Sequence, residues 1–283
     1  MRGHWSFGAA LAFPAGLCSL GCEDVARKSA DHARVNVAFV ADAAKSDVAQ
    51  VRAGLPQGAG SLTELFKRAH PEVPGPEAAS VALERARNRV QELRLAKSTF
   101  FALVLPDGRI VKNDQEQDLM VGKNFYQAFP ELKAALDKPY AEARGAMPEA
   151  AGVRGKPDGQ WVAQSPIREG AELRGAYVTG WSWSAYAYRL ETGLRSKILS
   201  ETDEGGKIPL LYVFVVVDQG VYGAPVTPAV NAKAVGDLKP LEHLGNEPWS
   251  TTLEIERRKF GLAVLAVSEL GAKVAVAVLR SET

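Results

Sequence analysis

Apolar residues recur at three- and four-residue steps in the N-terminal part of the chain, the spacing that places side chains on one face of a helix. The residues of this stripe are Val37, Val40, Ala44, Val48, Val51 and Leu55. Charged residues fall largely between them, so the pattern predicts one amphipathic helix over residues 23–55. Pro56 and the glycines after it are expected to end this helix. Ser61 and Glu64 have the spacing of a capping box, which predicts a short second helix through about Ala69.

A further helix is predicted from Pro76 to about residue 97, because proline is well tolerated in a first helical turn. Its apolar stripe runs from Leu83 to Leu93. The arginines on the other side of this helix are interleaved with glutamates. This pattern favours a solvated helix face over a phosphate-binding patch.

After residue 97 the apolar pattern becomes that of strands. An apolar run at 100–105, a Pro-Asp-Gly-Arg turn and a returning run at 110–111 predict a hairpin. Short helices are expected between residues 125 and 136, and a loop over 138–159. The last elements predicted for this half are strands at 160–164 and 172–183 and a connector helix at 186–200.

The same pattern starts again at residue 210. The elements predicted here are strands at 210–217, 221–222, 251–257, 260–267 and 273–279. The sequence therefore predicts an α+β fold, with two antiparallel sheets and their helices preceded by a long N-terminal helical segment. The expected division is 1–21 for a signal peptide, 22–98 for N-terminal helices, 99–200 for the first sheet with its connector helix, and 201–283 for a second sheet domain.

Several stretches of the first predicted sheet resemble Cache domains, the extracytoplasmic relatives of PAS domains in bacterial receptors. These stretches are 101–111 (FALVLPDGRIV), 121–124 (VGKN), 164–167 (QSPI) and 175–178 (GAYV). The resemblance covers residues 77–200 and, more weakly, 208–283. It implies tandem PAS/Cache-like sheets and a sensor that binds a small ligand outside the cytoplasm.

Two departures limit what this resemblance implies. Cache receptors usually continue into a membrane-spanning helix and an output module, whereas only four residues follow Leu279, so we expect a sensor module without its own output domain. Family members that bind amino acids typically carry a tyrosine, an arginine and a Trp-Tyr pair in fixed order. Tyr140, Arg144 and Trp161 do not reproduce that spacing, so amino-acid binding is not implied.

The N-terminus predicts export and anchoring. An uncharged stretch of about 16 residues follows Arg2, which is the order of a secretory signal, and it is shorter than the ~20 residues of a membrane-spanning helix. It ends in Gly21-Cys22, similar to a bacterial lipobox, so we expect acylation of Cys22 and an extracytoplasmic, membrane-anchored protein in the periplasm or on the outer surface. Ser19 stands where lipoproteins usually have leucine, and cleavage by an ordinary signal peptidase is the alternative.

Charge and composition argue against several functions. The formal net charge is +1, which gives no field that would attract nucleic acid. The four histidines lie far apart and both cysteines fall within the first 22 residues, so no metal site is predicted. The sequence has no nucleophile elbow and no phosphate-binding glycine loop. We therefore predict no catalytic residue, no cofactor and no enzymatic activity.

Aromatic residues give the candidate ligand site, which consists of Tyr126, Trp161, Tyr177, Trp181 and Trp183. The last three share one face if they alternate along a strand, and aromatic side chains with polar tips suit a small-molecule pocket. The alternative is that these residues fill the core between sheet and helices. A third hypothesis needs no small molecule: the chain is an envelope adaptor or scaffold that docks onto another membrane or periplasmic protein, such as an envelope signalling protein. A cavity under residues 175–183 favours the sensor, whereas a packed core with an exposed apolar groove favours the adaptor.

Overall fold

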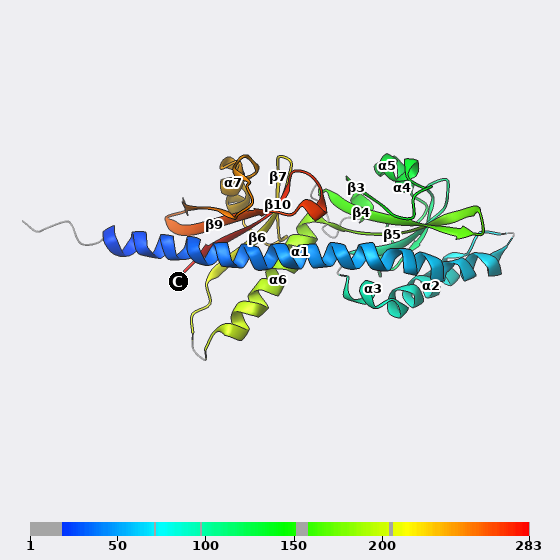
Figure 1. Ribbon diagram of the computed structural model, residues 1–283, viewed down its shortest axis with the longest axis horizontal. Coiled ribbons are helices and arrows are strands. Elements are labelled where there is room, and N and C mark those ends of the chain that lie inside the picture. Colours follow the sequence, from blue (N-terminus) through cyan, green and yellow to red (C-terminus); the bar gives the residue numbers. More distant parts are fainter. Residues whose placement is uncertain (1–18, 71, 97, 151–157, 204–205, 283) are drawn as a thin grey trace, which may run out of the picture.

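The computed structural model describes residues 19–70, 72–96, 98–150, 158–203 and 206–282. Two five-stranded antiparallel sheets lie side by side along one helix, α1 (Ser19–Ala69), as Figure 1 shows. The predicted two-sheet α+β fold with a long N-terminal helix is thus confirmed. Residues 1–18 of the predicted signal peptide and the side chain of Cys22 lie outside what is described. Within the described residues, no helix combines the length and apolar character needed to cross a membrane.

The two sheets repeat one topology. The first contains β1 (Phe100–Val104), β2 (Ile110–Asn113), β3 (Ala141–Gly145), β4 (Gln160–Glu169) and β5 (Glu172–Ser182), in the order β2-β1-β5-β4-β3. The second contains β6 (Leu210–Val217), β7 (Gly220–Gly223), β8 (Trp249–Ile255), β9 (Arg258–Ala266) and β10 (Val274–Ser281), in the order β7-β6-β10-β9-β8. Counted within each sheet, both orders read second, first, fifth, fourth, third. The restart of the sequence pattern at residue 210 therefore reflects a repeated fold.

The helices cover the two faces of the sheets. Besides α1, they are α2 (Pro76–Arg89), α3 (Gln91–Leu95), α4 (Phe125–Ala128), α5 (Pro130–Ala134), α6 (Trp183–Glu201) and α7 (Ala229–Asp237), with 3-10 turns η1 (Pro148–Ala150), η2 (Pro240–His243) and η3 (Ser268–Leu270). Helices α1, α2, α3 and α6 pack against one face of the first sheet. Helices α4 and α5 cover the opposite face (Figure 1). The chain therefore gives each sheet a helical layer on both sides, with α1 common to the two sheets.

The prediction that the first helix ends at residue 55 is wrong, because α1 continues through Pro56 to Ala69. The buried apolar stripe extends beyond the proline, so sheet packing holds both parts in one helix. Gly58 faces the first sheet, where an added Cβ would lie 2.5 Å from Cε1 of Tyr177. This glycine permits close helix-to-sheet packing and does not end the helix.

The structure differs from the sequence-based predictions at three further places, which are β3, the start of α6, and α7. Strand β3 lies inside the predicted loop 138–159 and pairs with β4 at the sheet edge. The predicted strand through residue 183 is wrong at its end, because α6 begins at Trp183. Ser182 caps this helix, and its hydroxyl accepts a 3.4 Å hydrogen bond from the Ala185 N–H. Helix α7 lies in a segment for which the pattern predicted no element.

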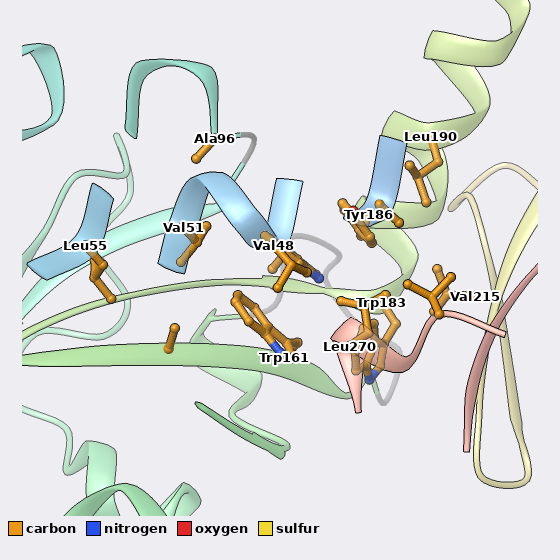
Figure 2. Packing of buried hydrophobic residues seen from close by; sticks show 14 of the residues in the cluster. Val48, Val51, Leu55, Ala96, Trp161, Trp183, Tyr186, Leu190, Val215 and Leu270 are labelled. Atoms are coloured by element: carbon orange, nitrogen blue, oxygen red, sulfur yellow. The ribbon is translucent and has the colours of Figure 1, made fainter. Parts of the chain in front are cut away.

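One apolar cluster runs without interruption from the first sheet to the second. Figure 2 shows Val48 and Val51 of α1 packed over Trp161, and Val215 and Leu270 of the second half close to the same group. Nearer its N-terminal end, α1 lies directly on β9, where a Cβ added to Gly261 would come within 2.1 Å of the Ala30 nitrogen. The two sheets therefore share a core across α1.

Buried charges fix α6 between α1 and the second sheet. Asp47 of α1 accepts two hydrogen bonds from the Arg189 guanidinium, at 2.9 and 3.0 Å, and one from the Tyr186 hydroxyl at 3.1 Å. Two residues after Arg189, Glu191 accepts hydrogen bonds from Arg195 and from the backbone N–H of Val213 in β6. Side-chain hydrogen bonds of this charge-assisted kind hold the connector helix in one orientation.

Candidate functional site

Four of the five predicted site residues form one buried aromatic cluster. Trp161, Tyr177, Trp181 and Trp183 are each at most 2% exposed and belong to the core between the first sheet and α1 and α6. Figure 2 shows Trp161 on the sheet and Trp183 at the start of α6. The ring of Trp181 stacks on Trp161 and on Tyr186, both at centroid distances of 4.4 Å. Packing of this kind fills the space between sheet and helices, so these four side chains lie in the core of the first half.

Two polar atoms of this cluster have no hydrogen-bond partner among the described residues. They are the hydroxyl of Tyr177 and the indole Nε1 of Trp181. Burial raises the pKa of Tyr177 well above its usual value, and the charge of Asp114 adds to the effect, so the hydroxyl stays protonated. Each such group lowers the stability of the folded state. Contact of these residues with a ligand remains a prediction.

Tyr126 does not join the other four residues. It lies in α4, on the opposite face of the sheet, next to Phe125 and the turn at Gly108. Its hydroxyl is buried and has no partner among the described residues. Burial, with a smaller contribution from Asp107, raises the pKa of Tyr126 above its usual value. The five predicted residues therefore occupy both faces of one sheet.

Two buried glutamines of β4 share that opposite face. The Gln160 side chain accepts a 2.6 Å hydrogen bond from the backbone N–H of Met147, and Gln164 donates a 2.5 Å hydrogen bond to the carbonyl of Leu132 in α5. The Oε1 atom of Gln164 has no partner among the described residues. Side chains alternate along β4, so both glutamines lie on the face of the sheet opposite to that of Trp161. This alternation could have been seen in the sequence. Sequence reasoning missed them because it followed only the aromatic residues.

A cleft of about 650 Å³ separates the two halves of the chain. Its walls include Arg144, Asp158, Trp183, Asp218 and Tyr222. Arg144 reaches across it, with Nη1 3.7 Å from Oδ2 of Asp218. Asp158 accepts hydrogen bonds from a backbone N–H at the start of α6, and burial raises the pKa of its carboxyl group. Charged side chains from both halves therefore line part of the cleft, and Trp183 is the predicted site residue that borders it.

Solved structures identify this arrangement of sheets and helices. The extracellular domain of vpHK1S-Z8, described as a histidine kinase, superposes with a TM-score of 0.60 at 7% identity, over 92% of this chain and 93% of that one. The chain has the fold of Cache/PAS-like sensory domains. A second match, a domain of a sensory box/GGDEF family protein from Vibrio parahaemolyticus, has a TM-score of 0.59 at 8% identity, over 91% and 97% of the two chains.

The Cache/PAS-like fold also includes a domain whose ligand is named. The ligand-binding domain of the amino acid chemoreceptor PctB from Pseudomonas aeruginosa, in complex with L-Arg, matches with a TM-score of 0.50 at 16% identity, over 92% of this chain and 96% of that one. No protein-family profile and no curated protein sequence matches the chain. At these identities the matches establish the fold, which confirms the resemblance seen in the sequence.

Proposed function

We propose that this chain is an extracytoplasmic, non-enzymatic sensor module that binds a small molecule and is held at a bacterial membrane by acyl chains on Cys22. The observation that carries the proposal is the match, over about nine-tenths of each chain, to the extracellular domain of a histidine kinase and to a domain of a sensory box/GGDEF family protein. A separate envelope signalling protein would receive the signal. The lipobox-like sequence supports the anchor, and Cys22 lies at the start of α1.

The ligand site that we propose lies on the sheet face beneath α4 and α5. Tyr126 and Gln164 supply a hydroxyl group and a carbonyl oxygen that have no partner among the described residues. Phe125, Phe129 and Met147 belong, with Tyr126, to the apolar cluster on this face of the sheet. A buried acceptor gains most from a ligand that can donate to it. The expected ligand is a small, mainly apolar molecule with at least one hydrogen-bond donor.

The helices over this face support the proposal because they are short. They have four and five residues, and Phe129 alone separates them. Helices this short have little stability of their own and depend on the packing beneath them. On the other face, by contrast, the aromatic cluster is held by α1 and α6. A ligand would therefore displace α4 and α5 and use the sheet, with Trp161, Tyr177, Trp181 and Trp183 behind it, as a fixed wall.

Thermal melts of the mature protein against a panel of small metabolites test this site. We expect at least one compound to raise the Tm of the wild type, and Tyr126→Phe and Gln164→Leu to abolish that shift. Tyr188→Phe is the matched control, because Tyr188 is 53% exposed and lies on α6. If no compound acts, or if the shift persists in both variants of the site, the proposed site is wrong.

The anchor is tested separately by mass spectrometry of the mature N-terminus and by fractionation. We expect an acylated Cys22 and a protein in the membrane fraction. Cys22→Ala should either release the chain from the membrane fraction or leave it there with its signal peptide uncleaved. Cys18→Ala is the control, since it removes the other cysteine and leaves the lipobox-like cysteine in place. A mature protein that starts at an unmodified residue contradicts the proposed anchor without affecting the ligand site.

A further inference from the structure

A surface groove lies between the last turns of α1 and the length of α2. It is lined by α1 from Ser61 to Ala69, by the two residues before α2, Pro74 and Gly75, and by α2 as far as Arg89, and has a volume of about 510 Å³. The groove lies near the end of α1 that is remote from Cys22 (Figure 1). It is separate from the aromatic cluster, from the face beneath α4 and α5, and from the cleft between the halves.

Three arginine side chains of the groove are available to bind a negatively charged group. Arg68, Arg85 and Arg89 line it, all are exposed, and their side chains form no hydrogen bond or close ion pair within the described residues, although the charge of Arg68 also acts on Glu64. Glu64 is the acid that lines the groove within the described residues, and the Lys67 ammonium group holds it at 2.7 Å. The groove therefore has an excess of unpaired positive charge.

The other charges of α2 point elsewhere. Arg87 forms a 2.9 Å ion pair with Asp114, on the side of α2 that faces the sheet. Glu77 and Glu84 are not among the lining residues of the groove. Glu84 and Glu92, which suggested an ordinary solvated helix face in the sequence, thus lie outside the groove that Arg85 and Arg89 line. Sequence spacing alone did not show this separation.

The floor between the arginines is apolar. Val81 is 55% exposed, and Leu65 and Ala82 are half-buried beside it. An apolar stripe with basic residues along its edges is complementary to an amphipathic helix that carries acidic residues beside its own apolar stripe. A small dissociated anion would use the arginines and leave the exposed Val81 uncovered.

The length of the groove also favours a peptide segment. The lining runs from Gly75, just before α2, to Arg89, the last residue of α2, which at 1.5 Å per residue is about 21 Å. A metabolite occupies only part of that length, whereas a helical segment of about 14 residues occupies all of it. We propose that the groove between α1 and α2 docks an acidic amphipathic helix of a partner protein.

Fluorescence anisotropy with a defined probe tests the proposal on the mature protein. The probe is a labelled 14-residue peptide with leucines on one face and glutamates beside them, and a second peptide has lysines in place of the glutamates. We expect the acidic peptide alone to bind, and its affinity to fall at least tenfold in Arg85→Glu/Arg89→Glu and in Val81→Asp. Arg94→Glu should leave it unchanged, because exposed Arg94 lies on α3 outside the groove.

Several outcomes would overturn the proposal. They are no binding of the acidic peptide, equal binding of the lysine peptide, or the same loss in Arg94→Glu as in the groove variants. Inorganic tripolyphosphate provides a further arm: if it binds with the same dependence on Arg85 and Arg89 while the peptide does not, the groove is a small-anion site. Circular dichroism of each variant separates lost docking from lost folding. None of these results depends on the ligand beneath α4 and α5.

Discussion

Two glycines in α1, two residues apart, should respond oppositely to alanine. In a helix interior alanine is more stable than glycine by about 1 kcal/mol. Gly60 has no atom within 4 Å of a built Cβ, so Gly60→Ala should gain nearly all of that amount. At Gly58 the added Cβ would lie 2.5 Å from Cε1 of Tyr177 and 2.8 Å from Cδ1 of Leu93. Both neighbours are fully buried, and the Tyr177 ring also stacks on Phe101, so neither has free space to enter.

Overpacking of a filled core costs about 1–3 kcal/mol, and a contact nearly 1 Å too short belongs at the upper end. Gly58→Ala should therefore lose about 2 kcal/mol relative to wild type after the helix gain, which places the two variants about 3 kcal/mol apart. At 2–4 °C per kcal/mol, their Tm values should differ by about 6–12 °C. Urea unfolding followed by circular dichroism and calorimetric melts measure the two quantities. If Gly58→Ala is as stable as Gly60→Ala, the close packing of α1 on β5 is not as described.

The remaining predictions concern charge and the aromatic core. Asp47→Ala should cost about 3 kcal/mol in urea unfolding because it leaves Arg189 without its buried partner, whereas Asp42→Ala, which removes an exposed pair, should cost less than about 0.5 kcal/mol. Burial alone would raise the pKa of Glu282, but hydrogen bonds with Arg280 and His32 outweigh it and hold the pKa below its usual value of 4.5. Stability from Glu282 is then present above pH 4.5 and disappears as the pH falls through the lowered pKa, so Glu282→Gln should melt below wild type at pH 7 and approach it in acid; a pH-independent difference would contradict this. Trp181→Ala should cost about 3–5 kcal/mol, and a loss under about 1 kcal/mol would show that Trp181 is not a core residue.

Periodicity predicted nine of the ten strands and both hairpin patterns because those segments contain runs of apolar residues with turns at the right places. Strand β3 escaped notice since Ala141–Gly145 contains no β-branched or aromatic residue. Its extended form comes from pairing with β4, in which Arg144 lies opposite Trp161. A strand that depends on its neighbour in this way leaves no periodic signal in its own sequence.

The candidate site was predictable in composition and not in arrangement. The sequence indicated which large aromatic residues lie inside, but their distribution over two faces depends on which helix covers which face. Trp183 reaches the cluster from α6, and Tyr126 comes to the opposite face because α4 covers that side. The charged groove was hidden for a related reason, because Arg68 meets Arg85 and Arg89 only after α1 continues past Pro56.

The placement of α1 across both sheets also determines when the chain can complete its fold. The first half of α1 packs on β9 and β10, so Ala30 meets Gly261, and these residues are more than 200 positions apart in the sequence. Contacts of such separation form late, because a long loop must close before they contribute any stability. During synthesis, the stripe at Ala33, Val37 and Val40 leaves the ribosome before the strands of the second sheet that cover it. Until the strands of the second sheet have been synthesised, this stripe is exposed apolar surface. A chaperone that protects the unfolded chain would therefore have to stay bound longest to this part of α1.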